Sequence, residues 1–173
     1  QKKENALIHC AQWITSTAGS SPASNPFSML PEPLVFPVRL FTVTLIPAKT
    51  HPMPALDAVT DLITEVFDEI GGKVFLHTHE DEICGLISNE SLVASGRTLD
   101  KKLARLQRQV TTYFLDAPVI IYHAKPISLA ELRQGYQLCE DSKALAFYVG
   151  RSAPIRATAH TVTAQPFHVS QAE

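Results

Sequence analysis

The stretch whose side chains could do the most chemistry is a hexapeptide, HTHEDE, at residues 77–82. It places two histidines and three carboxylates between the apolar runs KVFL and ICGLI. Two histidines separated by one residue on a strand point to the same side, an arrangement suited to zinc ligands. The carboxylates could instead bind Mg²⁺ together with a phosphate substrate. Three interpretations therefore compete: a zinc site, a magnesium site, and a solvated polar hairpin tip.

Both metal interpretations lack ligands elsewhere in the sequence. A zinc enzyme needs at least a third ligand with groups that orient it, and the Ser and Asp that follow His-x-His in JAB1/MPN-type metalloproteases are missing. The chain is also too short for the barrel of the amidohydrolases. Palm-type nucleotidyl transferases carry an acid at the end of their first strand, where this chain has LIPAK at 45–49. The sequence therefore predicts no catalytic residue, no metal site and no cofactor.

The composition narrows the class of protein further. The chain has 173 residues, 45% of them hydrophobic, with a formal net charge of -2, so it can form a core but offers no basic footprint for nucleic acid. Cys10, Cys84 and Cys139 form no CxxC pair and predict buried, reduced thiols and a cytoplasmic location. No apolar run approaches the roughly 18 residues of a membrane helix. Because the chain opens with Gln, we interpret it as a piece of a longer protein.

The elements that must position the hexapeptide follow from hydrophobic periodicity and turn residues. The pattern predicts, in order, a strand at 38–46, a helix at 55–70 ended by Gly71-Gly72, strands at 73–77 and 82–88, a helix at 99–115, a strand at 118–124, a helix from the capping box Ser128–Glu131 to Phe147 closed by Gly150, and a strand at 154–162. This β-α-β-β-α-β-α-β order is the ferredoxin-like, palm-type plan. We therefore expect an α+β fold, a mostly antiparallel sheet with helices packed on one face, in which HTHED is the hairpin loop.

The predicted domain organisation has three parts. Residues 1–35 contain a short helix at 3–15 and a Pro- and Ser-rich loop or linker at 16–35. Residues 36–165 form the α+β domain, and residues 166–173 form a tail.

Some further residues admit a functional or a structural interpretation. His123, beside an apolar strand, is expected to be a structural histidine, and Trp13 is expected to pack on the core. The basic run Lys101, Lys102, Arg105 and Arg108 is expected to be a solvated helix face.

The layout resembles the GGDEF (diguanylate cyclase) domain in a degenerate form, over residues 36–162. HEDEI, at 79–83, stands within VFLHTHEDEICGLIS where the family has its signature hairpin. VRLFTVTLIPAKTH resembles the first strand, and VIIYHAKPISLAELRQGYQLCEDSKALAFYVGRSAPI resembles the fourth strand, the following helix and a Gly-Arg-Asn turn, here Gly150-Arg151-Ser152. The residues that such a hairpin would present to a ligand are His79, Glu80, Asp81, Glu82 and Ile83.

Departures from the family pattern decide what the resemblance implies about activity. His79 and Glu80 replace the two glycines that let backbone approach the nucleotide, and they add bulk and negative charge. Pro47 or Ala48 stands where the family has its first-strand metal ligand, and no Arg-x-x-Asp motif precedes the hairpin. Because phosphoryl transfer depends on positioning and charge neutralisation, we expect no catalysis.

Degenerate domains of this kind resemble the middle regions of AraC-type bacterial transcription regulators and response regulators of two-component systems. The pattern Tyr136, Cys139, Ala144, Leu145 before FYVG is similar to theirs. The resemblance implies a non-catalytic domain that transmits a signal or self-associates between a sensory or receiver part and a helix-turn-helix part. Its partners would be those parts and a second copy, with DNA contacted only through a domain outside this chain and no membrane contact. The alternatives are a small-molecule or nucleotide sensor that uses the vestigial cyclase cleft, and a metal enzyme that uses His77 and His79.

Overall fold

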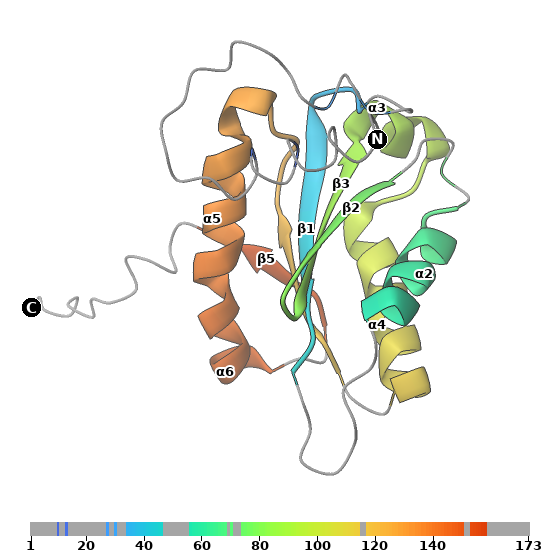
Figure 1. Cartoon of the computed structure of the whole chain (residues 1–173), viewed down its shortest axis with the longest axis vertical. Helices are drawn as coiled ribbons and strands as arrows, with labels where there is room; N and C mark the ends of the chain where they lie inside the picture. The colour runs from blue at the N-terminus through green and yellow to red at the C-terminus, as the bar shows by residue number, and fades with distance from the viewer. Residues whose placement is uncertain are drawn as a thin grey trace, which may run out of the picture.

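The central feature of the fold is a five-stranded sheet with the strand order β2-β3-β1-β4-β5 (Figure 1). In this computed structural model, the structure describes residues 10, 13, 27, 30, 34–46, 56–68, 70, 74–114, 117–150 and 153–158. The strands are β1 (Val38–Thr44), β2 (Val74–His79), β3 (Glu82–Ser88), β4 (Val119–His123) and β5 (Ile155–Ala157). The central strand β1 pairs antiparallel with both β3 and β4, β2 and β3 form an antiparallel hairpin, and β4 pairs parallel with β5. The predicted α+β fold with a mostly antiparallel sheet is thus confirmed.

Helices connect the strands in the predicted order. They are α2 (Leu56–Val66), α3 (Asn89–Ser95), α4 (Leu99–Phe114), the 3-10 turn η2 (Leu129–Glu131), α5 (Leu132–Ser142), the 3-10 turn η3 (Lys143–Leu145) and α6 (Ala146–Val149). The capping box predicted at Ser128 and Glu131 is present, with the Ser128 amide donating to the Glu131 carboxylate at 2.9 Å. Among the described residues, no helix has both the length and the apolarity that crossing a bilayer requires.

The expectation that helices cover one face of the sheet is wrong, because both faces are covered (Figure 1). One face packs with α2, α3 and α4, and the other with α5. The reason lies in β1, where Leu40 on one side and Phe41 and Val43 on the other are all fully buried. A strand that is apolar on both sides must be covered on both sides.

Residues from the N-terminal part complete the core on the α5 face. Cys10, Phe27, Leu30 and Leu34 are buried there. The Phe27 ring makes edge-to-face contacts with Phe36 and Phe75, each at 5.5 Å between centroids. Most of residues 1–35, including most of the expected helix at 3–15, lie outside the described residues, and the division at residue 35 stays a prediction.

The hairpin is tighter than the sequence predicts. His77, Thr78 and His79 belong to β2, so the loop consists of Glu80 and Asp81 alone. Glu80 has a positive φ of 55°, as two-residue turns between twisted strands require. His77 was also the last residue of the predicted strand at 73–77, so the prediction of HTHED as the loop is wrong at Thr78 and His79. The apolar flanks show which part of a strand is buried, but they do not show where its pairing ends.

Other boundaries also differ from the predictions. The short helix α3 was not predicted; it ends at Gly96, whose φ of 73° gives the left-handed cap. The predicted single helix to Phe147 is divided into α5, η3 and α6, and β5 is shorter than the predicted 154–162. The turn at 47–54, the cap Gly71-Gly72 and the tail 166–173 lie outside the described residues.

Candidate functional site

The five signature residues do not share one surface. His79 ends β2, and Glu80 and Asp81 form the exposed turn, whose Asp81 carbonyl accepts a hydrogen bond from the Leu45 amide at 2.9 Å. Glu82 and Ile83 begin β3 and are buried on opposite faces of the sheet, Ile83 among the side chains of the α2, α3 and α4 face. Only the first three residues are therefore open to a ligand at the hairpin tip.

Glu82 is the most constrained of the five, because it points towards α5. Its Oε1 accepts a hydrogen bond from the Tyr136 hydroxyl at 2.7 Å, and its Oε2 forms an ion pair with Lys143 Nζ at 2.7 Å. Lys143 Nζ also donates to Glu140 Oε1 at 3.1 Å. Tyr136, Glu140 and Lys143 are spaced by four and three residues, so they form one stripe along α5 and η3. We call these four residues the Glu82 cluster.

The Glu82 cluster keeps a proton up to a higher pH than isolated carboxylates would. Burial raises the pKa of Glu140 to about 7, and its hydrogen bond to Glu82 and the Glu82 charge act in the same direction. Burial also opposes ionisation of Glu82, but hydrogen bonds from Glu140, Lys143 and Tyr136 outweigh it and lower the pKa of Glu82. Glu82 therefore keeps its charge beside Lys143, and Glu140 carries the shared proton below neutral pH.

His77 and His79 lie beside the Glu82 cluster on the edge strand. Their rings are stacked at 6.4 Å between centroids, and the cross-strand partners of the two residues are Cys84 and Glu82. Burial lowers the pKa of His77, which favours its neutral imidazole. Within the described parts of the chain, no group of three His, Cys, Asp or Glu side chains is arranged to hold a metal ion.

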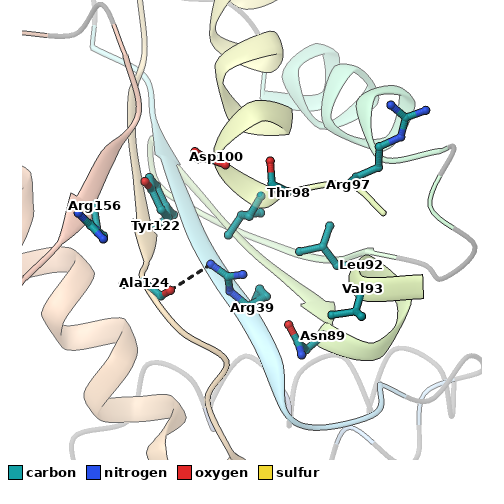
Figure 2. A pocket seen from close by; sticks show the side chains of 11 residues that line it. Arg39, Asn89, Leu92, Val93, Arg97, Thr98, Asp100, Tyr122, Ala124 and Arg156 are labelled. Carbon is teal, nitrogen blue, oxygen red and sulfur yellow. Dashed lines mark hydrogen bonds between the residues drawn. The ribbon is translucent and has the colours of Figure 1, made fainter. Parts of the chain in front are cut away.

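Two neighbouring basic hollows lie away from the signature turn. The first, of about 380 Å³, is lined by residues from β1, β4, β5, α3 and the start of α4 (Figure 2). The second, of about 300 Å³, includes Lys101, Lys102, Arg105 and Arg108. Arg97 and Thr98 line both hollows, and none of residues 79–83 lines either. The strand register places the first hollow at the opposite end of the sheet, because Arg39 neighbours Ile87 whereas Thr44 neighbours Glu82.

The predicted structural roles are mostly confirmed. His123 is buried, with Nδ1 at 3.2 Å from the Lys125 carbonyl, and burial lowers its pKa. Trp13 packs against the core of the α5 face, and the Arg133 guanidinium lies 4.6 Å from its ring centroid. The three cysteines are buried and form no disulfide; burial raises the pKa of Cys10 and Cys139 to about 12.

Lys102 corrects the expectation that the basic run is a solvated face. Its side chain is buried, and Nζ donates to the Val66 carbonyl at the C-terminus of α2 at 3.2 Å. A lysine there satisfies a carbonyl that the helix leaves without a partner and complements the helix dipole.

Sequence reasoning missed the partners of Glu82 and the position of Arg39. The spacing of Tyr136, Glu140 and Lys143 on one helical stripe was a usable signal, but it does not reveal which strand the stripe faces. Arg39 is a charged residue within an otherwise apolar strand, and this could have predicted a polar hollow beside the strand.

Comparison with known protein families and with curated protein sequences finds no match to this chain. The resemblance to GGDEF domains thus stays a prediction that rests on the quoted motifs.

Proposed function

We propose that the chain is a non-catalytic regulatory domain with a degenerate GGDEF-like fold, acting in the cytoplasm within a bacterial transcription regulator. In this role it transmits a signal, or associates with a second copy, between a sensory or receiver part and a DNA-binding part. The observation that carries the proposal is the engagement of Glu82 by Tyr136 and Lys143, each at 2.7 Å.

The contacts of Glu82 with Tyr136 and Lys143 disfavour metal-assisted phosphoryl transfer at this residue. A carboxylate that binds Mg²⁺ must present oxygen lone pairs to a hydrated ion, whereas both Glu82 oxygens are already paired inside the protein. Extracting Glu82 would leave the Lys143 ammonium without its closest counter-charge, and breaking a buried pair costs roughly 3–5 kcal/mol. At the end of β1, the turn contacts Leu45, which supplies a backbone amide and no acid.

The same contacts suit a transmitting role. Glu82 begins the strand that follows the signature turn, and Tyr136, Glu140 and Lys143 belong to the last long helix and the turn after it. A displacement of α5 relative to the sheet would strain the ion pair and change the proton balance of the cluster. The hairpin and the C-terminal helices are therefore coupled through charge as well as apolar packing.

The test is titration calorimetry of the chain with GTP and Mg²⁺, repeated with cyclic di-GMP and accompanied by a turnover assay. We expect no product and no saturable heat at about 1 mM ligand, which bounds any binding free energy to weaker than about -4 kcal/mol. Product that disappears in a Glu82→Gln variant would overturn the proposal. Saturable binding without turnover would favour the alternative, a nucleotide sensor that uses the vestigial cleft at 79–83.

A further inference from the structure

The first basic hollow has the features of an anion-binding site (Figure 2), and none of residues 79–83 lines it. Three adjacent strands supply its sheet side. Tyr122 of β4 is paired with Arg156 of β5 on one side and with Phe41 of β1 on the other. Arg39 lies two residues before Phe41 on β1. Side chains two apart on a strand share a face, so Arg39, Tyr122 and Arg156 stand together on one face of the sheet.

Arg39 is held in place without being neutralised. One guanidinium nitrogen, Nη2, donates to the carbonyls of His123 at 3.3 Å and Ala124 at 3.4 Å. Nε is buried, and among the described residues it has no hydrogen-bond partner. Carbonyl acceptors orient a guanidinium but leave its net charge, and no carboxylate of the described chain forms an ion pair with Arg39. Burial lowers the pKa of Arg39, and this effect exceeds the opposing one of the nearby Asp100.

The opposite side of the hollow adds positive potential. Thr98 and Leu99 stand at the start of α4, a 16-residue helix whose first amides carry a partial positive charge. Arg97 also lines the hollow, and Asp100 is the acidic residue among the lining side chains. Arg39, Arg156 and a helix N-terminus, with one aspartate among the lining residues, leave a positive surplus. Arg156, which is exposed, brings a second guanidinium to the edge of the site.

The apolar part of the lining limits what kind of anion fits. Leu92 and Val93 of α3 lie across from Tyr122, and Val93 is 67% exposed. A volume of about 380 Å³ falls within the range of small-molecule sites. Guanidinium groups recognise phosphate and carboxylate oxygens through paired hydrogen bonds, and the Tyr122 ring can support a flat or apolar body.

We propose that this hollow binds a small organic oxyanion, a phosphate ester or carboxylate, with its charged group on Arg39 and Arg156 and its body against Tyr122. The inference adds a ligand to the regulatory domain and does not depend on the proposed function. If the hollow binds no oxyanion, the proposed regulatory function is unaffected, because that proposal rests on Glu82. If the chain turns over GTP at the hairpin, the proposed oxyanion site is unaffected, because it rests on other residues.

The test is an NMR titration of the chain at constant ionic strength. The probes are phenyl phosphate and benzoate, and inorganic phosphate tests the charged group without an organic body. We expect saturable shifts of the amides of Arg39, Tyr122, Ala124 and Arg156, with those of residues 79–83 unchanged. Comparison of phenyl phosphate with benzoate shows which oxyanion the site prefers.

The variants are Arg39→Met, which keeps an apolar stem, and Arg156→Met, whose exposed position keeps the fold independent of the change. Each should weaken binding by about 10-fold or more, since the variant loses a charge-assisted hydrogen bond to the oxyanion. Arg108→Met, in the second hollow, is the matched control and should bind as the unmodified chain does. Equal binding by all variants, shifts confined to residues 79–83, or no saturable shift would overturn the proposal.

Discussion

At the residue scale, one glycine shows how closely side chains pack on the face of the sheet that α2 covers. Gly85 lies opposite Phe41 across the β1–β3 pair, and a Cβ at Gly85 would collide with the Cζ, Cε1 and Cε2 atoms of the Phe41 ring. The Phe41 ring is in turn stacked on Phe67 at 5.5 Å between centroids. The ring lies over the bare backbone of β3 because glycine has no side chain to exclude it.

Gly85→Ala should therefore destabilise the fold by about 1–3 kcal/mol, as overpacking of a close-packed core does. The measurement is urea unfolding followed by circular dichroism. Phe41→Leu removes the ring atoms that would collide, so the double variant should be less destabilised than the sum of the single variants. Strict additivity would show that the Phe41 ring is not what excludes a side chain at 85.

At the scale of elements, the Glu82 cluster joins the β2–β3 hairpin to α5. Glu140 is the member whose protonation changes near neutral pH, with its pKa raised from 4.5 to about 7. A raised pKa means that the folded state binds the proton more tightly than the unfolded state. Its stabilising contribution is therefore complete below pH 4.5 and is lost as the pH rises towards 7.

Glu140→Gln should remove this loss, because an amide does not ionise. Relative to the variant, the unmodified chain should lose of order 1–3 kcal/mol of unfolding free energy between pH 4.5 and pH 8, since each pKa unit corresponds to about 1.4 kcal/mol. Chemical unfolding at several pH values measures this difference, and Glu90→Gln, an exposed change on α3, is the control. Parallel pH profiles for the chain and Glu140→Gln would contradict the assignment of the proton.

The lowered pKa of Glu82 acts in the opposite sense and in a different range. Its contribution is present above the ordinary glutamate value and is lost as the pH falls through the lowered folded value. Glu82 thus changes the pH dependence of stability below pH 4.5, and Glu140 changes it above pH 4.5. Unfolding measurements on variants of each residue can separate the two contributions.

At the scale of the whole molecule, the sheet separates two apolar cores. One is shared with α2, α3 and α4, and the other with α5 and buried N-terminal residues such as Phe27. The first hollow opens on the α4 side, and the Glu82 cluster lies on the α5 side. A signal that passes between them must cross the sheet, and β1, the central strand, contributes to both cores.

If the chain works inside a transcription regulator, weakening the Glu82 cluster should change the output of the whole protein. We expect Lys143→Met in the full-length regulator to alter transcription from a reporter promoter by several-fold, at unchanged protein level. Lys125→Met, an exposed change near the end of β4, is the matched control. Unchanged reporter output in Lys143→Met, with normal folding, would count against transmission through the cluster.

Much of the fold could be predicted from the sequence because its signals are local. Alternating β-branched residues predicted β1, helical periodicity predicted α2 and α4, and the capping box at Ser128 was found where expected. The ends of elements were less predictable, since pairing and caps depend on neighbouring elements. Thr78 and His79 extend β2 beyond the predicted strand because Ile83 and Glu82 of β3 pair with them.

The sequence by itself determined the order of the strands and of the long helices between them, the burial of the cysteines and the polar character of residues 77–82. Only the tertiary structure decided which of those polar residues face solvent and which face protein. Glu82 and Asp81 are adjacent and chemically alike, yet one is paired inside the protein and the other is exposed. The distinction depends on where α5 crosses the sheet, and that position is set by packing between segments 54 residues apart in the chain.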